Sequence, residues 1–122
     1  MGYIYKNITG NTAIDLEVRD IENSKYKFST MTLCNTHATD SVSVNLYLNR
    51  TEMTDVRSAV GEGGDWNELE STTTSYYILN NVVIPNGSTL LLDSSYLKFD
   101  RSMYNLYIKL NASDSAVDIL LN

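Results

Sequence analysis

The chain has few of the residues that many functional sites require. Its 122 residues include one cysteine, one histidine, one proline and one tryptophan. The single Cys34 excludes an internal disulfide and is typical of synthesis in a reducing compartment. One cysteine and one histidine also cannot fill a tetrahedral zinc site. We therefore expect no disulfide scaffold, no bound metal and no cofactor.

Positive charge is scarce as well. Nine Lys and Arg stand against fifteen Asp and Glu, and the formal net charge is −6. Nucleic acids and anionic membranes both favour clustered Lys and Arg, so we expect neither as a partner. No apolar run approaches the roughly 18 residues needed to span a bilayer. The opening sequence MGYIYKNITG lacks the basic and apolar regions of a secretory signal, so we expect synthesis in a cytosol.

Alternation of apolar and polar residues is the main positive signal, and it is typical of strands with one buried face. It is clearest in Ile14–Arg19, Ser41–Leu48 and Asn105–Leu110. Less regular strands are expected at Lys27–Asn35, Tyr76–Asn80, Asn81–Ile84, Ser88–Leu92 and Ala116–Leu121. Seven or eight short strands predict an all-β fold, a single antiparallel β-sandwich of immunoglobulin-like or jelly-roll-like type.

The apolar positions of those strands predict the core. They are Ile14, Leu16, Val18, Met31, Leu33, Val42, Val44, Leu46, Ile78, Val82, Ile84, Leu90, Leu92, Leu106, Ile108, Leu110, Val117 and Ile119. The sequence Pro85-Asn86-Gly87-Ser88 is a typical turn. We therefore expect the strands on either side of it to form a tight antiparallel hairpin.

Two regions lie outside the alternating pattern. Residues 1–12 are expected to be an N-terminal arm or an edge strand, followed by the sandwich domain over residues 13–122. Residues 50–75 are expected to be a long inserted loop, because connections of this length are usually functional or disordered. Within that loop we allow at most one helical turn, over Met53–Val60.

The inserted loop contains the acidic stretch GEGGDWNELE, which starts at Gly61. Asp65 and Asn67 begin like a calcium loop, but Leu69 and Glu70 stand where a further oxygen ligand and a glycine are needed. The stretch also lacks the Lys-Ser/Thr of a phosphate-binding loop. Solvated carboxylates are the favoured interpretation.

Two catalytic alternatives are weighed against passive roles. Asp65 with Glu68 or Glu70 offers the paired carboxylates of a glycoside hydrolase. Cys34 and His37 offer a nucleophile and a base. A mobile acidic loop and a buried thiol next to a turn explain the same residues, so we predict that the protein is not an enzyme.

Aromatic residues provide the candidate contacts. Trp66 either covers the domain's own core or anchors a partner. Tyr47 and Tyr107 are expected on outward faces of strands, where aromatic residues stabilise cross-strand pairs and are also common at interfaces. The candidate interface residues are Tyr3, Ile4, Tyr5, Tyr47, Trp66, Leu69 and Tyr107.

Two segments carry a family resemblance. Thr32–Leu48 contains two strands around an Asn-Thr turn, and Tyr76–Leu92 contains a Tyr-Tyr strand and the sequence VVIPNGSTL. With the strand from Tyr104 to Leu110, they resemble small β-sandwich virion structural proteins of tailed, often marine, bacteriophages. The similarity covers about residues 30–121, and residues 50–75 depart from it.

The resemblance implies a non-enzymatic virion protein that is assembled in the host cytoplasm. Its expected role is capsid decoration (cement) or a neck or tail accessory. Its expected partners are other virion proteins, such as the major capsid, neck or tail proteins, and it is expected in multiple copies or as a homo-oligomer. The alternative is a carbohydrate-binding adhesion module on the virion that uses Trp66, nearby tyrosines and acidic groups.

Overall fold

The structure, a computed structural model, describes residues 4–18, 28–56, 68–101 and 103–122, and of residues 52–56 and 68–71 it describes only the backbone. In chain order its elements are β1 (Ile4–Thr9), β2 (Ile14–Asp15), β3 (Thr30–Asn35), β4 (Val42–Val56), β5 (Glu68–Ile84), β6 (Thr89–Asp93), the 3-10 helix η2 (Ser94–Tyr96), β7 (Asn105–Leu110) and β8 (Ala116–Leu121). Within these ranges no helix has the length and hydrophobicity needed to cross a membrane.

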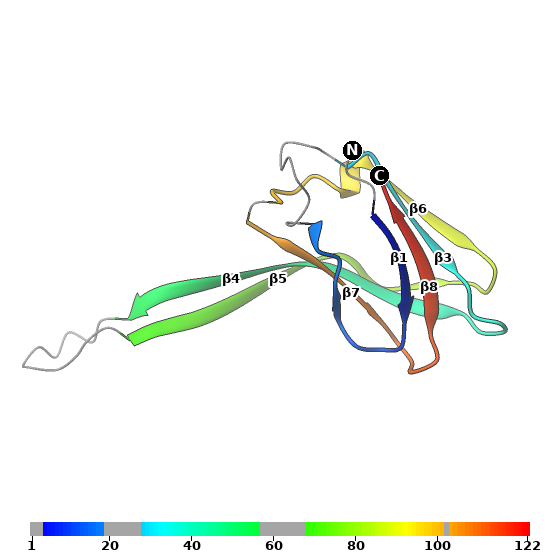
Figure 1. Cartoon of the computed structure of the whole chain (residues 1–122), viewed down its shortest axis with the longest axis horizontal. Helices are drawn as coiled ribbons and strands as arrows, with labels where there is room; N and C mark the ends of the chain where they lie inside the picture. Colours follow the sequence, from blue (N-terminus) through cyan, green and yellow to red (C-terminus); the bar gives the residue numbers. More distant parts are fainter. Residues whose placement is uncertain (1–3, 19–27, 57–67, 102) are drawn as a thin grey trace, which may run out of the picture.

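The strands form two four-stranded antiparallel sheets that pack against each other (Figure 1). Sheet A has the order β1-β8-β3-β6 and sheet B the order β2-β7-β4-β5. The pairs β1·β8, β2·β7, β3·β6 and β4·β5 are nested, as if one long hairpin had been rolled into a sandwich. This is the connectivity of a jelly roll. The predicted antiparallel β-sandwich is therefore confirmed.

A hydrophobic core fills the space between the sheets, and strand alternation places residues in it. In β7, for example, Leu106, Ile108 and Leu110 are buried while Lys109 between them is exposed. The predicted core residues are buried, except for four that are partly buried against the core: Ile14, Ile78, Val82 and Leu90. The core also contains residues that were not predicted: Ile4, Ile8, Phe28, Leu79, Leu97 and Leu121.

The strand predicted over Ile14–Arg19 is much shorter in the structure. It is limited to β2, because Glu17 has a positive φ of 59°. The Glu17 N–H donates instead to Asp15 Oδ1 at 2.8 Å. Leu16 and Val18 are nevertheless buried, as predicted.

The chain between β5 and β6 crosses from one sheet to the other. The predicted turn is present: the Ser88 N–H donates to Pro85 O at 3.0 Å, and Gly87 has a φ of 72°. The predicted tight hairpin is wrong, because β5 lies in sheet B and β6 pairs with β3 in sheet A. A short turn can join two strands of one sheet or connect one sheet to the other, and the local sequence does not distinguish these two arrangements.

The inserted loop predicted over residues 50–75 is in large part a hairpin. β4 continues to Val56 and β5 begins at Glu68, so the prediction of a loop is wrong for both flanks. The helical turn allowed over Met53–Val60 is also wrong as far as Val56, where the backbone is a strand. Residues 57–67 lie outside the described residues.

The outer half of this hairpin forms a projecting arm, which we define as Arg50–Val56 with Glu68–Thr74. β7 pairs with β4 only as far as Asn49, whereas β4 and β5 remain paired to Val56. The arm therefore extends beyond the sandwich as a two-stranded ribbon (Figure 1).

For residues 1–12, the edge-strand prediction agrees with the structure over β1. This strand lies at the edge of sheet A and pairs with β8 from Ile4↔Leu121 to Thr9↔Ala116. The alternative of a free arm is wrong for Ile4–Thr9, because the backbone of this segment is already paired within the sheet.

Candidate interaction surface

The arm is a polar and acidic extension of the sandwich. Its seven residue pairs run from Arg50↔Thr74 to Val56↔Glu68, and Thr51 Oγ1 lies 3.2 Å from Thr73 Oγ1 across them. In sequence, residues 50–75 hold six carboxylates and two arginines, a net charge of −4 out of the chain's −6. Isolated two-stranded ribbons are at best marginally stable in water.

Three tyrosines form a row across the outer face of sheet B, which we call the tyrosine ladder. Tyr77 on β5, Tyr47 on β4 and Tyr107 on β7 occupy directly paired positions. Their ring centroids are 5.1 Å apart for Tyr47 and Tyr77, and 5.7 Å apart for Tyr47 and Tyr107. Partial burial raises the pKa of Tyr47, and the neighbouring Tyr77 and Tyr107 phenols raise it further. The prediction that Tyr47 and Tyr107 face outward is confirmed.

The ladder stabilises the sheet and leaves little aromatic surface for stacking against a ligand. The Tyr47 and Tyr107 rings are within 11° of parallel, so each covers part of the other's face. Cross-strand aromatic pairs of this kind contribute to sheet stability. Tyr77, at the edge of the sheet, contacts one ladder ring and is 56% exposed. The open end of the ladder is therefore at the edge strand β5.

A second aromatic group holds the base of the arm. The Tyr76 and Tyr104 rings meet edge to face with centroids 6.0 Å apart. The Arg50 guanidinium carbon lies 5.9 Å from the Tyr104 ring centroid, within cation–π range. These contacts join Arg50, the first residue of the arm, and Tyr76 of β5 to the segment that precedes β7.

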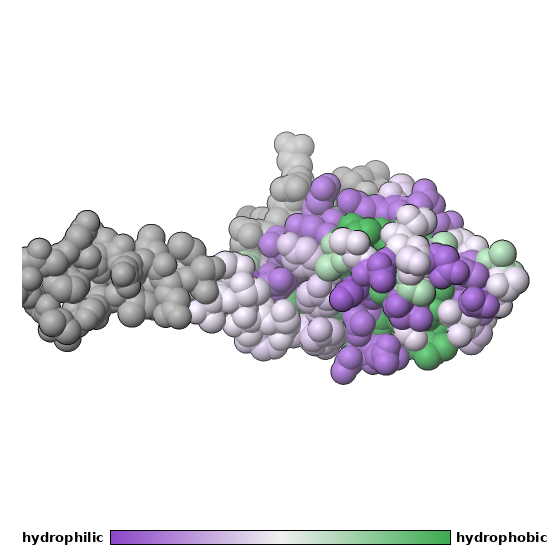
Figure 2. All heavy atoms as spheres, turned by 90° about the horizontal axis from the view of Figure 1, so that it is seen from below, coloured by the Kyte–Doolittle hydropathy of each residue, from purple (hydrophilic) through white to green (hydrophobic). Residues whose placement is uncertain are grey.

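Sheet A carries a separate exposed apolar row on its outer face. Tyr5, Leu120, Thr32 and Leu91 occupy paired positions across the four strands. Tyr5 is 66% exposed, Leu120 47% and Leu91 61%. A shallow pocket beside this row is lined by Tyr5, Lys6, Asn7, Asp118, Ile119 and Leu120. On the face shown in Figure 2, hydrophobic areas are small and separated by hydrophilic side chains.

The remaining predicted contact residues differ in how the structure places them. Tyr5 is exposed, whereas Ile4 is only 8% exposed and belongs to the core, so its prediction as a contact residue is wrong. Alternation along β1 explains the difference, because the two residues face opposite sides of the sheet. Tyr3 and Trp66 lie outside the described residues, and Leu69 is described only by its backbone in β5.

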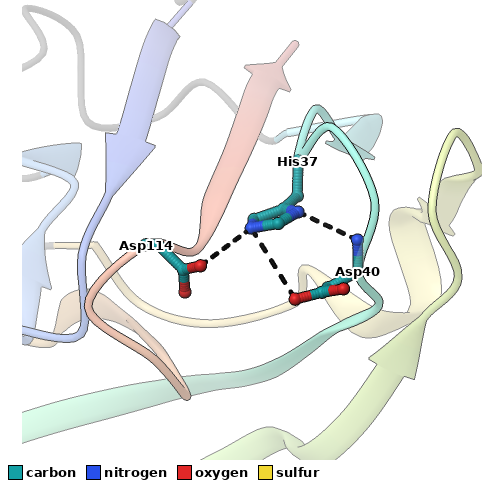
Figure 3. Close-up of side chains that lie close together, drawn as sticks. All are labelled: His37, Asp40 and Asp114. Carbon is teal, nitrogen blue, oxygen red and sulfur yellow. Dashed lines mark hydrogen bonds and ion pairs between the residues drawn. The ribbon is translucent and has the colours of Figure 1, made fainter.

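His37 connects three turns at one end of the sandwich, and Figure 3 shows its contacts with Asp40 and Asp114. Its Nδ1 accepts the N–H groups of Thr39 at 3.1 Å and Asp40 at 2.9 Å within the β3–β4 turn. Its Nε2 lies 3.0 Å from Asp114 Oδ2 in the β7–β8 turn. Its carbonyl accepts from Asn86 Nδ2 at 2.8 Å in the β5–β6 turn. The residue therefore holds the turns together.

The same cluster resembles a metal site in composition but does not fit one in its hydrogen bonding. His37, Asp40 and Asp114 offer three ligand atoms within 4.8 Å of one another. Because Nδ1 accepts two N–H donors, the proton of the neutral ring lies on Nε2, which then donates to Asp114. That hydrogen bond lowers the pKa of the Asp114 carboxyl. A metal at Nε2 would require the ring proton to move to Nδ1, against the two amide donors.

The hypothesis that Cys34 and His37 form a nucleophile and base receives no support from this geometry. Both ring nitrogens of His37 are engaged by the Asp114 carboxylate and by backbone amides of its own turn. A base must instead present a free ring nitrogen to the thiol. Cys34 is partly buried on β3, as expected of a structural thiol.

The structure does not describe the side chains of the carboxylates considered for hydrolysis. Asp65 lies outside the described residues, and Glu68 and Glu70 are described only by their backbone in β5. The calcium and glycosidase alternatives for this stretch therefore stay untested predictions.

The fold and the surface together define a jelly-roll β-sandwich with a projecting β-arm and an aromatic outer face. A scan against protein-family models, a search of curated proteins and a search of solved structures each found no match.

Proposed function

We propose that this protein is a non-enzymatic structural component of a tailed-phage virion, either a capsid decoration (cement) protein or a neck or tail accessory. It docks in several copies on other virion proteins and is assembled with them in the host cytoplasm. Its contact surfaces are the arm and the sheet edges. Nucleic acid and membranes are not its partners.

The observation that carries this proposal is the arm. Seven residue pairs of β4 and β5 extend beyond the last pairing with β7, and none of the other described elements pairs with them. Extended backbone exposed in this way is suited to recognition by a partner that adds a strand or encloses the ribbon. A passive domain that holds subunits together has a use for such an arm, whereas a self-contained enzyme does not require one.

The net charge of the arm indicates the kind of partner surface. Six carboxylates against two arginines in residues 50–75 favour a basic groove. Complementary charge of this kind guides association and fixes orientation, and its effect falls as ionic strength rises. The same acidity keeps the protein away from packaged nucleic acid.

The sequence resemblance and the fold support the same class of protein. Jelly rolls occur in viral capsid proteins and in lectins, so the fold fits both the virion role and the carbohydrate-binding alternative. The resemblance described above favours the virion role. The candidate catalytic histidine, His37, is engaged in linking turns.

The carbohydrate-binding alternative is supported by the aromatic residues of sheet B. In the tyrosine ladder, however, the Tyr47 and Tyr107 rings cover part of each other's faces. Tyr77 is the ladder ring that is well exposed for stacking against a sugar. A single well-exposed ladder ring is a small stacking surface for a sugar. We therefore keep this role as the second candidate.

An arm-deleted variant tests the proposal. Arg50 and Thr74 are directly paired, so residues 51–73 can be replaced by Asn-Gly, the preferred two-residue hairpin turn. Both proteins are mixed with tailed-phage particles purified from the culture that produces the chain, and the particles are sedimented. We expect the full chain to bind saturably, in a fixed ratio to the major capsid protein, and the variant to bind at least about tenfold more weakly, an effect of about 1.4 kcal/mol.

The control is Leu120→Ser, which changes an exposed residue on the inner strand β8 of sheet A and leaves the arm and the sheet edges intact. Equal binding by the arm-deleted variant would overturn the role of the arm. Absence of the chain from purified particles would overturn the virion proposal itself. Saturable binding to cell-surface polysaccharide, abolished by Tyr77→Ala, would favour the second candidate.

A further inference from the structure

β5 is the longest edge strand among the described residues. It lies at the edge of sheet B and pairs only with β4. Along Thr72–Ile84, where side chains are also described, no described strand pairs with its other side. An open edge presents a row of unpaired N–H and C=O groups, to which another strand can add.

The sequence of this edge lacks the features that usually protect one. Ser71–Ile84 contains no charged residue, no proline and no glycine, and the charge-free stretch from Ser71 to Leu92 is the longest in the chain. It is rich in Thr, Tyr, Ile and Val, which favour strands. Uncharged segments of this composition pair readily with other strands when they are exposed.

The other edges of the two sheets are protected. β2 has two residues and β6 has five, against seventeen in β5, and shorter edge strands are poorer templates. β1 carries Lys6 on the same side of the strand as the core residues Ile4 and Ile8. Its ammonium lies 3.6 Å from Glu17 Oε2, and an inward-pointing charge on an edge strand discourages pairing. β5 is therefore the exception.

We propose that β5 pairs antiparallel with β5 of a second copy of this chain, so that the two B sheets form one continuous sheet across a twofold axis. This deepens the proposed function and rests on it only in taking the sheet edges as contact surfaces. The pairing is centred within Thr72–Tyr77, because β5 is irregular beyond Tyr77: Asn81 has a φ of 56° and the register with β4 shifts between Leu46 and Tyr47.

A second copy fits this edge for two physical reasons. Antiparallel pairing of one edge with itself closes both open edges in a single symmetric contact. Each chain carries a net charge of −6, but Ser71–Ile84 contains no charged residue. Pairing along this segment therefore places no like charges opposite each other. Tyr77, the exposed end of the tyrosine ladder, lies at the same edge. Pairing there gives Tyr77 new cross-strand neighbours.

The test is the mass of the purified protein by sedimentation velocity over a range of concentrations. We expect a monomer–dimer equilibrium for the native chain. The variant T72K/T74K adds two lysines on one face of the edge, and we expect it to weaken the dimer at least about tenfold because the lysines of both copies meet. The matched control is T89K/L91K, with the same spacing on the exposed residues of edge strand β6, and it should leave the dimer unchanged.

A cysteine scan locates the axis directly. In a Cys34→Ser background, Thr72, Thr73, Thr74, Ser75 and Tyr76 are changed one at a time to Cys and exposed to a mild oxidant. We expect disulfide-linked dimers at one or two adjacent positions, since directly opposed residues of antiparallel strands have Cα atoms about 4.5–5.5 Å apart. Thr89→Cys on β6 should not cross-link.

Three results would overturn the inference. They are a monomer at every concentration, a dimer that T72K/T74K does not weaken, and a dimer that T89K/L91K weakens instead. Because these measurements use the purified chain, a failure here leaves attachment to particles unaffected. Conversely, absence from particles does not change the mass of the purified chain.

Discussion

At the scale of single residues, the buried polar group that matters most is Asn35. It is 1% exposed, and its Nδ2 donates to Asp40 O and to Ile84 O, both at 2.9 Å. Its Oδ1 accepts the His37 N–H at 2.9 Å. One side chain therefore connects the β3–β4 turn with the end of β5, and satisfied buried groups of this kind specify one arrangement of the chain.

Asn35→Asp should strongly destabilise the fold. The substitution replaces the donor amide with a carboxylate oxygen that faces two carbonyl oxygens, so we expect the free energy of unfolding at pH 7 to fall by about 3 kcal/mol or more. Urea denaturation measures this change. Acidification should recover part of the loss, because a protonated carboxyl can donate to one carbonyl. Asn11→Asp, at an exposed turn position, is the control, and an equal effect there would contradict the explanation.

The Asp114 carboxyl should make stability depend on pH. The hydrogen bond from His37 lowers its pKa in the folded state. Its contribution is therefore fully present above the ordinary value of about 3.9 and is lost as the pH falls through the folded value below it. The difference in unfolding free energy between the native chain and Asp114→Asn should shrink as the pH is lowered from 6 to 2. A difference that stays constant over this range would contradict this account.

At the scale of the elements, β4 and β5 each serve two purposes. Their inner parts, up to Asn49 and from Ser75, belong to sheet B and the core, whereas their outer parts form the arm. The arm adds backbone hydrogen bonds, and its described side chains Thr51 and Thr72–Thr74 are exposed. Folding of the sandwich and docking by the arm are therefore separable.

Deleting the arm should leave the sandwich almost as stable as before. For the variant in which Asn-Gly replaces residues 51–73, we expect a change in unfolding free energy within about 0.5 kcal/mol, as for surface changes away from the core. Thermal unfolding followed by circular dichroism measures it. Loss of cooperative unfolding would show that the core depends on the arm. Ile108→Ala, at a fully buried position of β7, is the contrasting control, with an expected cost of about 2–5 kcal/mol.

At the scale of the whole molecule, charge and shape are unevenly distributed. Residues 50–75 carry −4 of the total −6, whereas β5 is uncharged from Ser71 to Ile84. Copies of the chain repel one another through their overall charge and can meet without local repulsion along β5. Association should therefore depend on salt in opposite ways at the two surfaces.

Salt should strengthen the dimer and weaken docking to particles. Raising the ionic strength from about 0.02 to 0.2 M shortens the screening length and reduces repulsion between two chains of charge −6. We expect the dimer dissociation constant to fall several-fold, as measured by sedimentation. Binding of the acidic arm to a basic groove should weaken over the same range. A dimer that weakens with salt would contradict pairing along an uncharged edge.

Much of the fold could be predicted because alternation is a local property. Residues such as Leu33, Leu46 and Ile108 alternate with polar neighbours, and all are fully buried. Ile4 and Ile8 followed the same rule, but Lys6 between them on the core-facing side concealed it. The outer parts of β4 and β5, which form the arm, show no such alternation, because the sandwich covers neither face of the arm. The run Thr72–Thr74, with its high strand propensity, was the available indication.

The candidate surface could be predicted only in part. Tyr47 and Tyr107 were placed correctly, because alternation also identifies outward positions. Tyr77 was missed as the third member of the ladder, and so were Tyr76 and Tyr104 at the base of the arm. Ring contacts at 5.1 Å and 6.0 Å depend on which strands are neighbours, and alternation contains no information about strand order.

The sequence by itself determined the approximate positions of most strands within the sandwich, their inward and outward faces, the turn at Pro85 and the scarcity of catalytic groups. These follow from short-range sterics and from the free energy of burying apolar surface, which act on a few neighbouring residues. Only the tertiary structure decided that β5 and β6 belong to different sheets, that the nested pairs form a jelly roll, and that β4 and β5 continue outward as an arm. Those outcomes depend on long-range strand pairing, and many pairings satisfy the same local pattern until the whole chain is packed.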